Sequence, residues 1–255
     1  MNKKLVLLAG KGTSTNIIYH ALKDEFFIQA IILEDAESRI DFLKRRIKKL
    51  GAWKVFGQVL FQVMIAPALK SASSSRKKEI FNEYNLNAAD LPGEKLMPVR
   101  SVNEKLVVQI LQDLEPSLII VNGTRIISKS ILQAVPAKFI NIHVGITPKY
   151  RGVHGGYWAL INKDTMNCGV TIHVVDSGID TGNIISQQQI TITSKDNIFT
   201  YPFLQLAAAI PHLRSAIHDL FKGEPLIKKS TGESKLWSHP TLWEYLYYRI
   251  VRGIK

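Results

Sequence analysis

Two polar side chains suited to acyl-transfer chemistry lie two positions apart in Asn141-Ile142-His143. At the end of a β-strand, residues at this spacing project from the same side of the sheet, so both could face one ligand. A carboxylate, Asp180, follows in the glycine-containing segment 176–182, where we expect a loop between two strands. An amide can stabilise an oxyanion, an imidazole can move a proton, and a carboxylate can orient the imidazole. Taken singly, such a residue more often forms a turn or a satisfied polar contact than a catalytic site.

Alternating apolar strands and helices predict the scaffold that positions these residues. Apolar runs predict strands at 5–9, 27–33, 117–121, 139–143, 170–175 and 184–192. Helices are expected at 14–22, 41–50, 53–69, 101–114, 128–134 and 198–221, the last of them broken or kinked at Pro202 and Pro211. This alternation predicts an α/β fold with a mostly parallel sheet and helices on both faces.

Composition narrows the class of protein. The 255 residues, 46% of them apolar, suit a globular chain. One cysteine, Cys168, excludes an internal disulfide framework and a multi-cysteine zinc site, so we expect no bound metal. The apolar run after Lys4 is too short for a secretory signal because Gly10 interrupts it, so a cytoplasmic location is expected.

A longer pattern surrounds the Asn-x-His pair. Residues 141–152 read NIHVGITPKYRG, followed by GVTIH at 169–173 and GIDTG at 178–182. These motifs resemble the folate-dependent formyltransferase family, which includes glycinamide ribonucleotide, methionyl-tRNA and nucleotide-sugar N-formyltransferases. The similarity is strongest over 118–190 and weaker over 5–33. It implies a Rossmann-like sheet, with a catalytic domain at 1–222 that carries a basic apolar helical insertion near 41–80, and a C-terminal appendage at 223–255.

The resemblance also implies roles for individual residues. Asn141, His143 and Asp180 match the family's catalytic positions, for attack of an amine on the formyl group of 10-formyltetrahydrofolate, the co-substrate. The family's pterin lies against two backbone segments, which correspond here to Thr124, Arg125, Ile126 and Ile127, and to Val175, Asp176, Ser177 and Gly178. Ile126 and Ile127 could equally belong to the core.

The acceptor is less defined by the pattern. Gly10-Lys11-Gly12-Thr13 offers backbone N–H groups and a cation at a helix start, which suits an acceptor phosphate as well as a structural turn. His154 could line the acceptor site or begin a helix. Val144-Gly145 stands where family members often have Pro-Ser. We expect an amino sugar on a nucleotide or lipid carrier as acceptor. Alternatives are glycinamide ribonucleotide and a non-catalytic folate- or nucleic-acid-binding module.

Basic charge concentrates in one apolar segment. The net charge is +12, and ten Lys and Arg residues lie between Lys44 and Lys78 with no Asp or Glu among them. The helix expected at 53–69 has a wide apolar face, and it is too short to span a bilayer, which needs about 20 apolar residues. A polar linker is expected at 71–76. Residues 44–78 and the aromatic tail suit an anionic membrane surface; a buried helix or a homo-oligomer contact is the alternative, and nucleic acid is a weaker candidate.

Overall fold

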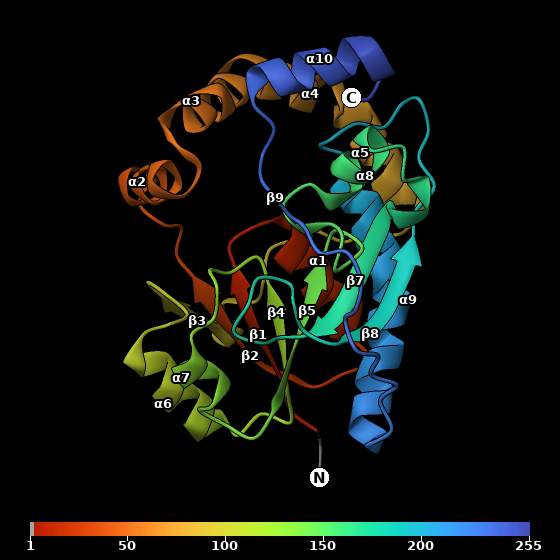
Figure 1. Cartoon of the computed structure of the whole chain (residues 1–255). Coiled ribbons are helices and arrows are strands. Elements are labelled where there is room, and N and C mark those ends of the chain that lie inside the picture. Colours follow the sequence, from red (N-terminus) through yellow and green to blue (C-terminus); the bar gives the residue numbers. More distant parts are fainter. Residues whose placement is uncertain (1–2) are drawn as a thin grey trace.

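The computed structural model describes residues 3–255 and contains a central sheet surrounded by helices (Figure 1). The sheet strands are β1 (Leu5–Gly10), β2 (Ile28–Glu34), β3 (Leu96–Val99), β4 (Leu118–Asn122), β5 (Lys138–His143), β7 (Gly169–Val174) and β8 (Ile184–Gln189). The helices next to the sheet are α1 (Thr13–Leu22), α6 (Lys105–Leu114), α7 (Lys129–Leu132) and α9 (Tyr201–Lys222). Short 3-10 turns occur at η2 (Gly93–Lys95) and η3 (Thr165–Asn167).

The seven strands of the sheet lie in the order β3-β2-β1-β4-β5-β7-β8. The first five in this order pair in parallel, whereas β7 runs antiparallel to both β5 and β8. The predicted α/β fold with a mostly parallel, Rossmann-like sheet is therefore confirmed. Parallel strands end at a common edge, so the loops after β1, β4 and β5 meet there.

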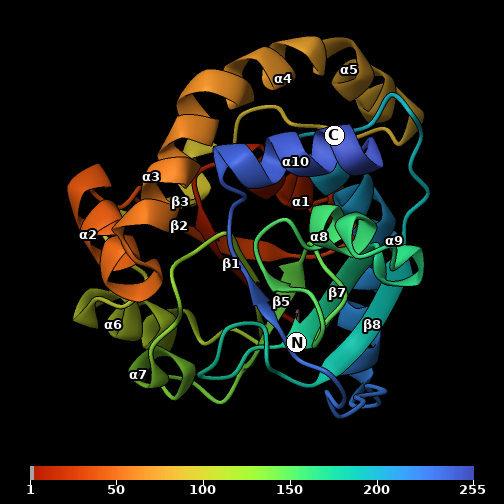
Figure 2. The same cartoon turned by 45° about the horizontal axis from the view of Figure 1, so that its top comes forward.

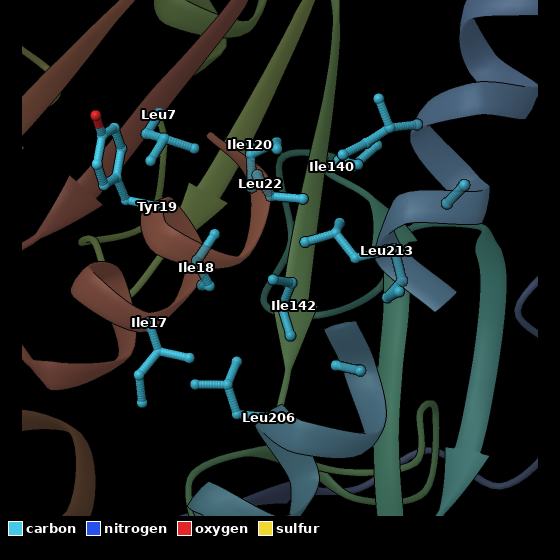
Figure 3. Close-up of a cluster of buried hydrophobic side chains, with 14 of the residues drawn as sticks. Leu7, Ile17, Ile18, Tyr19, Leu22, Ile120, Ile140, Ile142, Leu206 and Leu213 are labelled. Carbon is cyan, nitrogen blue, oxygen red and sulfur yellow. The ribbon is translucent and has the colours of Figure 1, made fainter. Parts of the chain in front are cut away.

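Alternate residues of the strands pack into separate hydrophobic cores on the two faces of the sheet. Leu5 and Leu7 of β1 pack with α1 and α9, and Figure 3 shows part of this cluster, including Ile17, Leu206 and Leu213. Val6 and Leu8 of the same strand contribute to the core under α6 and α7. Because side chains alternate between faces in a strand, a continuous apolar run covers both cores.

A second group of elements forms an arch at the end of the molecule opposite the N-terminus (Figures 1 and 2). It consists of α2 (Arg39–Leu50), α3 (Ala52–Leu60), the π-helical turn η1 (Phe61–Ile65), α4 (Ala66–Ala72), α5 (Ser74–Glu83) and α10 (Leu242–Arg252). Beneath it lies α8 (Gly155–Ile161), with the two-residue strands β6 (Arg151–Gly152) and β9 (Leu236–Trp237) paired in parallel. Phe61, Tyr157 and Tyr245 share a third apolar cluster that holds the arch on α8.

Three expectations about helices are wrong. The polar linker at 71–76 is helical, because Ser73 is buried and bonded to Asn197, and Arg76 pairs with Asp196 at 2.8 Å. Helix α9 is not broken: it continues through Pro211, since the residues on either side of it pack on the sheet, and Pro202 lies in the first turn, where its missing N–H costs nothing. The expected kink at Pro211 stays a prediction. The segment judged too short to span a bilayer forms a 21-residue helix, Ala52–Ala72, which is long and apolar enough to cross one by length and composition alone.

Candidate active site

Strand β5 ends with the Asn-x-His pair inside the sheet. Asn141 lies opposite His173 of β7, and His143 lies opposite Thr171. Neighbouring strands on both sides fix the direction of the β5 side chains. His143 is buried, Asn141 is partly buried, and both line the same cavity.

Asp180 reaches this pair from the loop between β7 and β8. Its backbone has a left-handed φ of 51°, and the neighbouring Gly182 packs so closely that a Cβ there would lie 1.7 Å from the Val174 carbonyl oxygen. The Asp180 Oδ2 atom accepts a hydrogen bond of 2.9 Å from the Gly152 N–H. The carboxylate is thus held between a tight loop and the backbone that follows β5.

The hydrogen bonds of His143 decide which of its nitrogens can do chemistry. Its Nε2 atom lies 2.7 Å from the Tyr150 carbonyl oxygen, and because a carbonyl only accepts, this nitrogen carries the hydrogen. The Nδ1 atom of the neutral ring therefore presents a lone pair, 3.3 Å from Asp180 Oδ2. A proton arriving at Nδ1 would be stabilised at once by the carboxylate.

Asn141 has a donor in the same network. Its Nδ2 atom lies 3.1 Å from His173 Nε2 and donates a longer bond of 3.4 Å to Asp180 Oδ1. His173 Nδ1 bonds the Val174 carbonyl oxygen at 2.8 Å, which leaves Nε2 of the neutral ring as an acceptor. One Asn141 hydrogen is therefore well bonded to His173, and the other makes the longer bond to Asp180, which a ligand in the cavity could replace.

Burial and charge set the protonation states at neutral pH. Burial lowers the pKa of His143, and this outweighs the opposite effect of Asp180. Burial alone would raise the pKa of Asp180, but His173, His143 and the Gly152 N–H lower it below its usual value. The site thus combines a neutral imidazole with an ionised carboxylate, the arrangement that general-base catalysis requires.

A cavity of about 450 Å³ opens beside these groups, at the ends of β4 and β5. Seven of the eight residues predicted to hold the folate line it: Thr124, Arg125, Ile126, Ile127, Val175, Asp176 and Gly178. Ser177 does not appear in the lining. Ile127 is buried in the core, whereas Ile126 is 49% exposed on the cavity wall, so the two isoleucines differ in environment.

Arg125 is tied to the scaffold by an ion pair. Its Nη1 atom lies 2.8 Å from Oε1 of Glu34, a buried carboxylate at the end of β2 that also accepts from the Arg125 and Val102 N–H groups. The segment after β4 is therefore anchored to β2, which fixes the shape of this cavity wall.

Several residues around the cavity were given no role by sequence. They include His173, Asn122 and Ser14, together with Pro202, Phe203 and Leu206 of α9. Asn122 bonds the Ser14 and Thr15 hydroxyls at 3.0 and 2.9 Å, which joins β4 to the start of α1. His173 belongs to the GVTIH motif, so the sequence indicates this residue but not its contact with Asn141. Pro202, Phe203 and Leu206 belong to no motif, so no sequence signal indicates that they line the cavity.

The residues predicted to bind the acceptor lie next to the cavity but do not line it. Gly10 allows a close backbone contact, since a Cβ there would lie 2.4 Å from the Gly123 carbonyl oxygen. Lys11 pairs with Asp35 at 2.7 Å on the surface. Gly12 and Thr13 lead into α1, of which only Ser14 reaches the cavity. His154 is the N-cap of α8, and its Nε2 atom lies 2.9 Å from His239 Nδ1.

Close packing explains why glycine stands at position 145. A Cβ on Gly145 would lie 2.4 Å from the Tyr150 carbonyl oxygen and 2.7 Å from His143 Nε2. A Cβ on Gly155 would in turn lie 2.5 Å from the Gly145 Cα atom. The two glycines therefore let α8 pack closely against the hydrogen bond between His143 Nε2 and the Tyr150 carbonyl oxygen. Within residues 3–255 no cluster of His, Cys, Asp or Glu is arranged to hold a metal ion.

Comparison with known proteins shows which family this chain resembles in sequence. Residues 41–202 match the model of the formyl transferase family. The methionyl-tRNA formyltransferase of Thermodesulfovibrio yellowstonii is 35% identical over 127 residues, which are 49% of this chain and 41% of the relative. That of Nitratiruptor is 41% identical over 95 residues, 37% of this chain and 30% of the relative. The chain thus spans less than half the length of these curated relatives.

Solved structures share the fold at low sequence identity. A 4-N formyltransferase from Francisella tularensis has a TM-score of 0.57 at 19% identity, over 92% of this chain and 76% of that one. Phosphoribosylglycinamide formyltransferase from Anaplasma phagocytophilum has a TM-score of 0.56 at 17% identity, over 92% and 95%. An N-formyltransferase from Helicobacter canadensis, solved with folinic acid and dTDP-3-aminofucose, has a TM-score of 0.54 at 16% identity, over 93% and 71%. Because the family model covers more than half of its residues, this chain belongs to the formyl transferase family.

Proposed function

We propose that the protein is an N-formyltransferase that moves a formyl group from 10-formyltetrahydrofolate to an acceptor amine in the cytoplasm. The observation that carries the proposal is the buried network of Asn141, His143 and Asp180 at one cavity, with the imidazole neutral and its Nδ1 lone pair beside a carboxylate. This is the group set that amine attack on a formyl carbon needs.

The proposed chemistry requires one proton acceptor and one oxyanion donor from the chain. The amine nitrogen bonds to the formyl carbon, and the proton it loses passes to His143 Nδ1, directly or through Asp180. The Asn141 Nδ2 hydrogen that makes the longer bond to Asp180 turns to the oxyanion, and this hydrogen and the resulting imidazolium stabilise it. When the carbon–nitrogen bond to the folate breaks, the same proton goes to the departing nitrogen, so His143 returns to its neutral form.

The cavity wall suits the flat ring of a folate co-substrate. Ile126 presents an apolar side chain at the wall, and Gly123, with a left-handed φ of 66°, leaves open space where a Cβ would stand. Backbone groups of Thr124–Ile127 on one side, and of Val175 to Gly178 on the other, are candidate partners for ring nitrogens, apart from the N–H groups of Arg125, Val175 and Gly178, which bond Glu34, Phe139 and Asp176. We therefore propose these segments as the folate-binding walls.

For the acceptor we propose an amino sugar on a nucleotide or lipid carrier. One structural relative was solved with dTDP-3-aminofucose, which supports a small carbohydrate amine, whereas the curated sequence relatives act on methionyl-tRNA. The segment Gly10–Thr13 and Ser14 lie where an acceptor phosphate would approach the cavity from the α1 side. Glycinamide ribonucleotide remains the alternative acceptor for the same approach.

The decisive assay measures release of tetrahydrofolate that depends on an added amine. The purified chain is given 10-formyltetrahydrofolate with glycinamide ribonucleotide, methionyl-tRNA, several nucleotide-linked amino sugars and a lipid-linked amino sugar. Turnover with an amino sugar supports the proposal. Turnover confined to either of the first two acceptors overturns the acceptor assignment, and folate binding without turnover on any acceptor indicates a non-catalytic module.

A further inference from the structure

The arch leaves an unusual amount of apolar surface uncovered. Five apolar residues recur at helical spacing along α10, and all are exposed, Ile250 at 81%: Trp243, Leu246, Tyr247, Ile250 and Val251. The opposite side of α10 is the packed one, because Tyr245 is buried against Phe61 with ring centroids 5.1 Å apart. The helix is therefore already anchored, and this stripe of apolar residues stays exposed to solvent, although Trp243 also stacks on Trp53.

Helix α3 and its continuation carry a second stripe of the same kind. Trp53, Phe56, Val63 and Met64 are 51–72% exposed, whereas Val55, Gln58 and Phe61 on the other side are buried. Only 28% of the most apolar window in Ala52–Ala72 is buried. The alternative of a buried helix therefore does not fit the apolar side of this segment, whereas a homo-oligomer contact stays an alternative.

The two stripes join at a pair of tryptophans. Trp53 stacks on Trp243 with ring centroids 5.0 Å apart, and Trp53 also lies 5.9 Å from Phe56. Figure 2 shows α10 lying alongside the chain of helices from α3 to α4. We call the exposed apolar residues of these helices the arch face: Trp53, Phe56, Val59, Val63, Met64, Trp243, Leu246, Tyr247, Ile250 and Val251.

Basic residues flank the arch face. Helix α2, which precedes α3, has no buried residue, although Ile40, Leu43, Ile47 and Leu50 repeat along it at helical spacing. Its Lys44, Lys48 and Lys49 make no ion pair with any residue in 3–255. An amphipathic helix with a basic polar side and an uncovered apolar side is typical of helices that lie in a membrane interface.

The charge and the apolar character of the arch face together indicate which kind of partner binds it. A second copy of the chain would bring the same basic surface against itself in a two-fold contact, which like-charge repulsion disfavours. A nucleic acid would neutralise the lysines but leave the aliphatic side chains uncovered. An anionic bilayer satisfies both, since its headgroups pair with lysines and its acyl region accepts the apolar residues.

The contacts of Gln58 favour lying on the bilayer over crossing it. The Gln58 amide donates to the His239 carbonyl oxygen at 2.6 Å and accepts from Arg46 at 2.6 Å. A spanning helix would have to break these bonds and leave a polar group in hydrocarbon. We propose that the arch face, together with α2, docks this protein on the surface of an anionic lipid bilayer.

Co-sedimentation of the purified full chain with vesicles tests this docking. One set of vesicles contains phosphatidylcholine alone, and the other also contains phosphatidylglycerol. We expect binding to the anionic vesicles that weakens as salt is raised, because the lysines are exposed. An alkaline carbonate wash should release the bound protein. No binding to anionic vesicles at low salt, or resistance to the carbonate wash, overturns surface docking.

Matched variants locate the contact. Val63→Ser and Ile250→Ser each remove an exposed apolar side chain from the arch face, and each should weaken binding about tenfold. Leu226→Ser is the control, since Leu226 is 82% exposed but lies outside the arch. Because all three residues are exposed, the variants should fold. Equal binding by Ile250→Ser and Leu226→Ser contradicts the proposal, as does a stable dimer that Ile250→Ser converts to a monomer.

Tryptophan fluorescence adds a measure of depth. Trp53 is 72% exposed, so docking should shift its emission to the blue, and brominated lipids should quench it. Trp53→Phe should lower the quenching without abolishing it, since Trp243 also belongs to the arch face, whereas Trp158 is buried. Quenching that is unchanged in Trp53→Phe would place the contact elsewhere. None of these measurements uses folate or an acceptor, so their failure is separate from failure of the proposed formyl transfer.

Discussion

At the scale of single residues, Asp180 connects three parts of the site. One carboxylate contacts His143, His173 and the Gly152 N–H, at 3.3, 3.6 and 2.9 Å. It therefore fixes the imidazole and the Asn141 amide with respect to each other. The proposed roles depend on this arrangement, and each role gives a separate prediction.

Replacing Asn141 by Ala should remove a donor for the oxyanion and leave the fold intact. We expect kcat to fall about 100-fold or more, because loss of one such donor costs on the order of 3 kcal/mol in the transition state. The control is Asn162→Ala, whose amide bonds the Trp158 carbonyl oxygen outside the cavity. Near-wild-type turnover of folded Asn141→Ala would refute the proposed role.

Acid sensitivity of stability should report the buried His143. Its folded-state pKa is lowered by burial, so below the usual value of 6.5 the unfolded chain binds the proton more readily. The free energy of unfolding should therefore fall as the pH drops from about 7 to about 5. In His143→Gln this loss should be smaller, since Gln does not titrate. Urea unfolding at several pH values measures both slopes, and equal slopes would contradict the assignment.

At the scale of elements, the loop between β7 and β8 should control activity through the position of Asp180. In Gly182→Ala the new Cβ meets the Val174 carbonyl oxygen, so the loop must move. A shift of about 1 Å in a catalytic group can cost up to 100-fold in rate, and we expect kcat to fall at least tenfold. Gly93→Ala, where a Cβ meets nothing within 4 Å, is the control. Unchanged kcat in Gly182→Ala would show that the loop tolerates the movement.

The contact between α3 and α10 should contribute measurably to stability. A Cβ on Gly57 would lie 2.2 Å from the Trp243 ring, so Gly57→Ala must displace the indole from Trp53. We expect a loss of about 1–3 kcal/mol in the free energy of unfolding, in the range for overpacking. Urea titration, again with Gly93→Ala beside it, measures the loss. A stability equal to that of Gly93→Ala would mean that α10 is held by other contacts.

The elements that the sequence predicts well are those with strong local patterns. The strand that holds Asn141 and His143 forms where an apolar run indicates it, because a buried parallel strand needs such a run. Helix α10 was missed, although Thr241 and Glu244 form the capping box that a Thr-x-x-Glu spacing indicates. The helix over 74–76 depends instead on Asp196, which is 120 positions away from Arg76, and no local pattern shows such a contact.

The same distinction applies to the candidate site. The Asn-x-His pair and Asp180 belong to motifs, so their proximity was expected. The position of His154 was not, because it depends on His239 of the C-terminal segment. Burial lowers the pKa of His154 to about 3 and that of His239 to about 4, and the pair is enclosed with Arg46 nearby. This pair joins the tail to the scaffold under the arch.

At the scale of the whole molecule, the cavity and the arch lie at the same end. The carboxyl ends of β4 and β5 point toward α8 and α10, and Gln58 and His239 connect the arch to the segment before α10 (Figure 1). The division at residue 222 stays a prediction, although β9 pairs with β6 inside the preceding part of the chain. A chain docked through the arch face would hold its cavity near the lipid headgroups.

This geometry predicts that the acceptor's location decides whether docking matters. With a lipid-linked amino sugar in anionic vesicles, docking raises the local acceptor concentration, so Ile250→Ser should lower kcat/KM about tenfold, in proportion to its weaker binding. With a water-soluble amino-sugar nucleotide, the same variant should match the wild type, because Ile250 does not line the cavity. Leu226→Ser should match the wild type in both assays. Equal losses with both acceptors would show that Ile250 supports the fold or the site rather than docking, and equal activity on vesicles would show that the acceptor reaches the cavity from solution.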